Sequence, residues 1–192
     1  MPKLKKKWNE IEESTGAFSD IEPGAYKLVI TKVEPNEDME YARIYWDVAE
    51  GPSKGAYAQS QFPPSDVLSW KDTALGMLKH KLHVLAESNA GFQPTVAFDR
   101  DDWQAFVGKS FGAVVRKRLY TAGPRSKNPG ADRESVEVAA WLMPDDLAAG
   151  KFSENLLKPR DTREKQPQQA ASVPDTYQPA TTPDLYDEDV PF

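Results

Sequence analysis

The chain contains no cysteine, only two histidines and no long apolar run. Without cysteine, its 192 residues cannot build a disulfide framework, a cysteine-based zinc site or a thiol nucleophile. The N-terminal lysines lead into Trp8-Asn9-Glu10 rather than into an apolar stretch, so the sequence does not predict a signal peptide. No segment is long and apolar enough to span a bilayer. We therefore expect a cytoplasmic protein that uses no metal or cofactor.

The net charge of -6 is unevenly distributed along the chain. From Pro159 onward, three basic and seven acidic residues contribute -4, which leaves about -2 for the preceding residues. That last part also has almost no apolar residue to bury, and we expect residues 159–192 to be disordered. Residues 1–20 are interpreted as an arm and residues 21–158 as one folded domain. Such a nearly balanced domain can bind nucleic acid if its basic residues gather on one face.

Alternation of apolar and polar residues predicts strands, because side chains of a strand point to opposite faces in turn. The segment 39–49 is the clearest case, with one face made by Ala42, Ile44, Trp46 and Val48. Prolines and serine at 63–65 are expected to end the first sheet segment. The five expected strands are residues 25–34, 39–49, 56–62, 111–120 and 135–143.

Leucines at positions 75, 78, 82 and 85 recur at helical spacing and predict a helix that runs to about Glu87. Residues 88–91 are typical helix-stopping residues. A second short helix is expected within residues 99–107, capped by Asp99 or Asp101, and Asp102 is interpreted as another helix-capping residue. A third helix begins at Pro144.

Three strands, a helix and two further strands follow one another in the order of the OB-fold, a five-stranded Greek-key barrel. The sequence therefore predicts a mainly β protein of this class, with short accessory helices and an acidic tail. Another small α+β domain is the alternative.

OB-folds bind oligonucleotides on their second and third strands and on the neighbouring loops. In the expected strands, tyrosines alternate with arginines, which combines rings that stack on bases with cations that contact phosphate. The alternative is that these tyrosines only cover a barrel edge. The candidate DNA-binding residues are Tyr41, Arg43 and Tyr45 on the second strand, Tyr57 on the third, Arg116, Arg118 and Tyr120 on the fourth, and Arg125, Lys127 and Arg133 in the loop that follows.

A metal-dependent nuclease is the enzyme alternative, and its best candidate ligands are His80, His83 and Glu87. Helical spacing places these three on one face, opposite the leucines. The outward face of a helix is, however, where such residues ordinarily lie. We expect a binding protein rather than an enzyme, without catalytic residues.

The final segment combines acidic residues with Pro191 and Phe192, and it has no neighbouring lysine or arginine. An aromatic ring and a terminal carboxylate on one residue suit a pocket with a basic rim, so the segment is a candidate docking peptide. The expected partner-binding residues are Asp187, Glu188, Asp189, Val190, Pro191 and Phe192.

This ending resembles the acidic tip of bacterial single-stranded DNA-binding proteins, in which a run of Asp precedes Ile and a terminal Pro-Phe. Glu188 replaces an Asp of that pattern and Val190 replaces the Ile. The resemblance implies that the tip recruits replication, recombination and repair proteins.

The preceding domain resembles phage-encoded single-stranded DNA-binding proteins in three short segments, at residues 23–26, 47–51 and 88–92. This resemblance implies sequence-independent binding and protection of single-stranded DNA during replication or recombination in the cytoplasm of a host cell. The alternative function is a protein adaptor or recombination accessory factor that uses the barrel for protein contacts. A homo-oligomer is a further possibility, because a barrel edge that pairs with a second subunit has the same sequence pattern as any other exposed strand.

Overall fold

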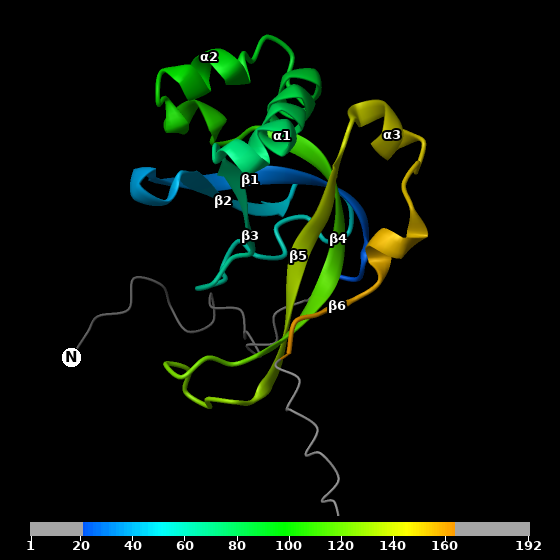
Figure 1. The fold of residues 1–192 in the computed structure, drawn as a ribbon. Coiled ribbons are helices and arrows are strands. Elements are labelled where there is room, and N and C mark those ends of the chain that lie inside the picture. The colour runs from blue at the N-terminus through cyan, green and yellow to red at the C-terminus, as the bar shows by residue number, and fades with distance from the viewer. Residues whose placement is uncertain (1–20, 164–192) are drawn as a thin grey trace, which may run out of the picture.

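The computed structural model describes residues 21–163, which form a mainly β fold as the sequence predicts (Figure 1). Its open sheet has the strand order β3-β2-β1-β4-β5, and all neighbours on this path are antiparallel. A short sixth strand pairs with β4 in parallel. The strands are β1 (Gly24–Asn36), β2 (Tyr41–Val48), β3 (Ser65–Ser69), β4 (Ser110–Thr121), β5 (Asp132–Leu142) and β6 (Arg160–Asp161).

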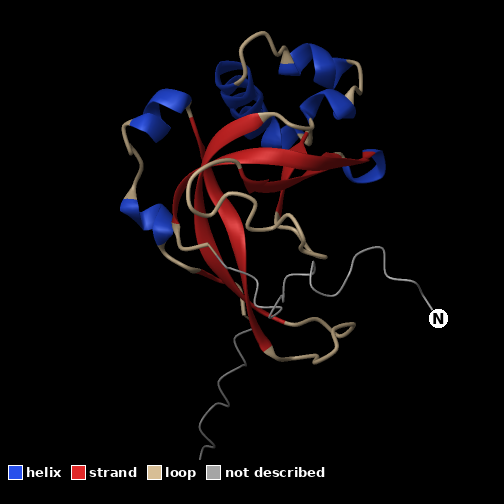
Figure 2. Ribbon diagram, turned by 180° about the vertical axis from the view of Figure 1, so that it is seen from behind, coloured by secondary structure: helices blue, strands red, loops and turns tan. Residues whose placement is uncertain are grey.

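Helices lie outside the curved sheet, as the view from behind makes clear (Figure 2). The two helices between β3 and β4 gather at one end of the molecule, while the β4–β5 hairpin extends toward the other end (Figure 1). The helices are α1 (Leu75–Ser88), α2 (Pro94–Asp99) and α3 (Pro144–Ala148), and the 3-10 helices are η2 (Glu37–Met39), η3 (Asp72–Ala74), η4 (Trp103–Phe106) and η5 (Glu154–Leu157).

The core forms where the apolar face of β2 meets β1, β4 and α1. Ile44 and Trp46 of β2 are fully buried, as the alternation in this strand predicts. Leu82 and Leu85 of α1 pack against the same core and confirm the predicted helix. Burial of each large apolar side chain stabilises the fold by about 1.5–3 kcal/mol.

The expected third strand at residues 56–62 is wrong, because these residues form turns and β3 begins only at Ser65. The expected end of the sheet at residues 63–65 is wrong for the same reason. Proline has no amide hydrogen and sits easily just before an edge strand. Here the carbonyl of Pro64 accepts a hydrogen bond of 3.1 Å from the amide of Trp46, which aligns the chain for β3.

Asp66 on β3 brings the two end strands of the open sheet together. Its Oδ2 accepts hydrogen bonds of 2.7 Å from the Trp141 Nε1 of β5 and from the Lys81 Nζ of α1. Lys81 Nζ also donates to the carbonyl of Val67 at 2.7 Å. The side chain of Lys81 is 6% exposed, so this ion pair is buried beneath α1.

The region after α1 differs in detail from the expected single helix at residues 99–107. α2 begins earlier, at Pro94, and η4 follows as a separate turn. The carboxylate of Asp102, rather than Asp99 or Asp101, caps η4 by accepting a hydrogen bond from the amide of Ala105. Proline suits the first turn of a helix, since its missing amide hydrogen would have no partner there.

The described fold continues past the expected domain boundary at Lys158, because β6 pairs with β4 through Arg160 and Asp161. The expected arm at residues 1–20 and the tip at residues 187–192 lie outside the described residues. Within residues 21–163, no helix is long and apolar enough to cross a membrane.

Candidate nucleic-acid interface

One set of predicted residues lies on β2, where Tyr41, Arg43 and Tyr45 alternate with core residues. The register of the sheet places Glu34 of β1 opposite Arg43 and Lys32 opposite Tyr45. The two tyrosines are partly exposed and Arg43 is exposed, so the three form an accessible stripe along the outer face of the hairpin.

Glu34 organises the charges of this stripe. Its carboxylate accepts a hydrogen bond of 2.5 Å from Lys32 Nζ and one of 2.6 Å from the Tyr45 hydroxyl. The bond from Lys32, followed by the one from Tyr45, holds the pKa of Glu34 below its ordinary value. Lys32 Nζ also lies 5.5 Å from the centre of the Tyr45 ring. Arg43 also interacts electrostatically with Glu34, but among residues 21–163 it forms no direct ion pair.

A hollow of about 530 Å³ lies beside this stripe, and Tyr41 and Arg43 form part of its lining. The turn that closes the β1–β2 hairpin carries three exposed acidic residues, Glu37, Asp38 and Glu40. The end of the stripe next to this turn is therefore negatively charged. Binding of an anionic chain is favoured only along β2 itself.

A second set lies on β4, where Arg116, Arg118 and Tyr120 point to one side of the sheet. Arg116 Nε donates a hydrogen bond of 2.8 Å to Glu137 on β5, so this guanidinium is already paired. The Arg118 guanidinium lies 5.7 Å from the centre of the Tyr120 ring, a cation–π contact that holds both side chains. The expected place of Arg133 in the loop is wrong, because this residue lies on β5, directly opposite Tyr120.

The β4 set borders a groove of about 630 Å³ between the β2–β3 loop and the strands β4 and β5. Four of the predicted residues line this groove: Tyr57, Arg118, Tyr120 and Arg133. Phe62 and Arg160 line it as well, although the sequence pattern did not indicate a binding role for them. An isolated phenylalanine between a glutamine and two prolines is the signal that could have indicated Phe62.

Each acidic residue that lines the groove has a cationic partner. Asp66 pairs with Lys81, Glu134 pairs with Lys117 and Glu137 pairs with Arg116. Within the described part of the chain, Arg118 and Arg133 form no ion pair. Two guanidinium groups beside an aromatic ring therefore remain for an anionic ligand.

Tyr57 does not fit the expected role on an exposed strand. Tyr57 is only 6% exposed. Its ring packs edge-on against the ring of Trp46, and the two ring centres are 5.8 Å apart. The backbone amide of Tyr57 donates a hydrogen bond of 3.0 Å to Asp47 Oδ1, and Asp47 is itself buried. Tyr57 therefore stabilises the β2–β3 loop from within, although one edge of it borders the groove.

Arg125 and Lys127 lie in the loop between β4 and β5, as predicted, but neither lines the groove. The ten candidates include a stripe on β2, a groove set at β4 and β5, and a basic loop beyond that groove. The group at β4 and β5 brings two predicted arginines and a tyrosine to one hollow, whereas the hollow beside β2 has one predicted arginine and one predicted tyrosine.

The three candidate metal ligands are separated by their contacts. His80 Nε2 lies 3.3 Å from the carbonyl oxygen of Trp141, whereas His83 Nε2 lies 3.6 Å from Glu87 Oε1. Among residues 21–163, no three histidine or acidic side chains come close enough to hold a metal ion.

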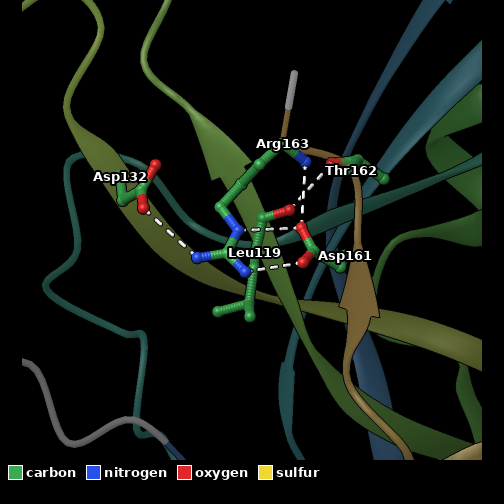
Figure 3. A network of polar contacts seen from close by, with 5 residues as sticks. All are labelled: Leu119, Asp132, Asp161, Thr162 and Arg163. Carbon is green, nitrogen blue, oxygen red and sulfur yellow. Dashed lines mark hydrogen bonds and ion pairs between the residues drawn. The ribbon is translucent and has the colours of Figure 1, made fainter. Parts of the chain in front are cut away.

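The described residues end beside the β4–β5 hairpin, where Arg163 forms ion pairs with both β6 and β5 (Figure 3). Its guanidinium binds Asp161 at 2.6 Å and Asp132 at 3.2 Å, and the amide of Thr162 donates to the carbonyl of Leu119 at 2.8 Å. The hydrogen bond with Asp161 is the main cause that raises the pKa of Arg163. These contacts hold residues 161–163 against β4 and β5.

The chain matches no protein-family model, and no curated protein matches it significantly. The chemistry of the groove and the stripe therefore carries the functional argument.

Proposed function

We propose that this protein binds single-stranded DNA with little sequence preference, through the groove at β4 and β5 and the stripe on β2. The observation that carries this proposal is the meeting of Arg118, Tyr120 and Arg133 in one groove. Both arginines lack a carboxylate partner among the described residues, and the tyrosine stands opposite Arg133 and two residues from Arg118 in the strand register.

This combination suits a single strand better than a duplex. Guanidinium groups neutralise phosphates, and an aromatic ring stacks on any base, because every base has a π-face. The faces of the bases are hidden in a duplex, so a duplex would gain only the phosphate interactions. Stacking contributes about 1–3 kcal/mol per base, which is enough to decide the preference.

The architecture supports assignment to the OB-fold. Three antiparallel strands, the helix α1 and two further strands follow one another in the OB-fold order. The hydrogen bond between Asp66 and Trp141 brings β3 toward β5, the two strands that meet when such a barrel closes. Within this fold, the outer face of β2 and β3 is the expected oligonucleotide face.

A continuous path joins the stripe to the groove. Tyr45 stands opposite Ser65 in the pairing of β2 with β3, and Ser65 lines the groove. A strand of DNA could therefore run along Tyr41, Arg43 and Tyr45 and continue past Ser65 to the groove.

The C-terminal tip supplies the second part of the proposed function. Residues 187–192 resemble the tips that recruit replication, recombination and repair proteins, and we assign them the same role here. Protection of a single strand and delivery of partner proteins would then be combined in one chain, as in phage replication or recombination.

A paired substitution tests the groove. We expect Arg118→Gln with Arg133→Gln to weaken binding to a thymidine oligonucleotide and to flatten the log-log salt dependence by about 1.4, because each phosphate that is no longer neutralised accounts for about 0.7. The control is Lys71→Gln with Lys79→Gln, which removes the same charge from exposed sites that do not line the groove.

If both double variants weaken binding equally, only overall charge matters and the groove assignment is wrong. If the wild-type protein binds no single strand even at low salt, the protein-adaptor alternative is favoured instead.

A further inference from the structure

Phe62 is the most exposed large apolar side chain in residues 21–163, at 86%. A single exposed apolar residue needs no explanation by itself. Its position does, because Phe62 lines the groove that also contains Arg118, Tyr120 and Arg133. Met77, which is 64% exposed on α1, does not line this groove and serves as a comparison.

The backbone around Phe62 is held rather than free. Its amide donates a hydrogen bond of 3.2 Å to Ser60 Oγ, and two prolines follow it. The carbonyl of Pro64 in turn accepts from the amide of Trp46, a fully buried residue. Prolines restrict the backbone dihedral angle, so little conformational entropy is lost when the ring meets a ligand.

Arg160 supplies a charge at the same groove. It stands directly beside Arg118 in the parallel pairing of β6 with β4. Its Nη1 lies 3.8 Å from Glu137 Oε2, while the other oxygen of that carboxylate accepts the 2.8 Å bond from Arg116. Glu137 is therefore shared between Arg116 and Arg160, so the positive charges of Arg118 and Arg160 on these adjacent strands are only partly balanced by carboxylates.

We propose that Phe62 and Arg160 form a nucleotide subsite of the groove, in which the ring stacks on one base and the guanidinium holds an adjacent phosphate. This subsite rests on the proposed single-stranded DNA function and adds the loop before β3 and the strand β6 to the binding surface. Phe62 and Tyr120 then offer two stacking rings within one hollow, and Arg118 and Arg160 offer a paired phosphate site.

Single substitutions test the two halves of the subsite separately. Phe62→Ala is expected to weaken binding of a thymidine oligonucleotide by about 5- to 150-fold with an unchanged salt slope. Phe62→Trp should restore the affinity, and the fluorescence of the new tryptophan should be quenched by the bound base. Arg160→Gln should flatten the log-log salt slope by about 0.7.

The controls separate this inference from the proposed function. Met77→Ala removes an exposed apolar side chain elsewhere and should bind as the wild type does, while circular dichroism checks that each variant is folded. If Tyr120→Ala weakens binding but Phe62→Ala stays within about twofold of the wild type, the subsite is wrong and the groove remains. Absence of binding by the wild type overturns both.

Discussion

Asp66 on β3 accepts a 2.7 Å hydrogen bond from the indole nitrogen of Trp141 on β5, so the first and last strands of the open sheet are joined by one carboxylate. The same oxygen pairs with Lys81 of α1, whose side chain is buried. A helix thereby covers the place where the two sheet ends approach each other. This interaction positions β5, and with it one wall of the groove.

Lys81→Met should lower the free energy of unfolding by about 3 kcal/mol, because it leaves the Asp66 carboxylate without its buried counter-charge. Urea denaturation measures this change. Lys79→Met, two residues away on the exposed face, is the control and should change stability by less than about 0.5 kcal/mol. Equal stability of the two variants would show that Asp66 and Lys81 do not form a buried pair.

Tyr45→Ala should weaken binding of single-stranded DNA with an unchanged salt slope, because it removes a stacking ring and no charge. Tyr45→Phe keeps the ring but removes the hydrogen bond to Glu34, so it should bind almost as the wild type does. Fluorescence titration at several salt concentrations measures both. If Tyr45→Phe weakens binding as much as Tyr45→Ala, the hydroxyl group and not the ring is required.

Glu34 should titrate below the ordinary pKa of a glutamate, since hydrogen bonds from Lys32 and Tyr45 favour its ionised form. Its folded-state pKa then lies below the unfolded one, so its contribution to stability is present above the unfolded pKa and is lost as the pH falls through the folded pKa. Carboxyl-carbon NMR follows the titration directly. The stability difference between the wild type and Glu34→Gln should accordingly shrink in acid, and an ordinary pKa would contradict the hydrogen bonds.

Deletion of residues 184–192 should leave DNA binding intact or slightly tighter, most visibly at low salt. Arg163 is held beside Asp132 of β5, and the 29 residues that follow it in the sequence include six acidic residues and one basic residue, so we expect the acidic tip to compete with phosphate. Gel-shift assays at two salt concentrations measure this competition. Weaker binding after the deletion would mean that the tip supports DNA binding instead.

Removal of Phe192 alone should abolish the recovery of replication or repair proteins in pull-down experiments, although nearly all the acidity of the tip remains. The matched control keeps Phe192 and neutralises Asp187, Glu188 and Asp189. If recovery survives the removal of Phe192 but fails in that control, the tip acts as a charge tether without a pocket for the ring.

Elements with one dominant periodic pattern could be predicted from the sequence. Ala42, Ile44 and Trp46 alternate without interruption, and the leucines of α1 keep helical spacing, so both elements were predicted with nearly correct bounds. The order of these elements was enough to indicate a mainly β fold. It was not enough to predict the contact between the two ends of the open sheet, because Asp66 and Trp141 are distant in the sequence.

Other residues could not be placed from the sequence, because tertiary interactions override the local pattern. The pattern around Tyr57 indicates a surface ring of a strand, yet Trp46 and the buried carboxylate of Asp47 draw it into the core. The sequence around Phe62 indicates only a loop, and the tertiary fold places this residue in the lining of the groove. Arg160 lies in a segment whose composition indicates disorder, and its pairing with β4 could not be predicted from so short a strand.

The most direct test of the proposed function is a fluorescence titration of the wild-type protein with a thymidine oligonucleotide and with a duplex of equal length, at several salt concentrations. Binding to the single strand should be tighter than binding to the duplex, and its log-log salt dependence should have a slope of about -0.7 for each phosphate neutralised. Equal affinity for the two ligands, or no binding of the single strand at low salt, would contradict single-stranded DNA binding by this groove.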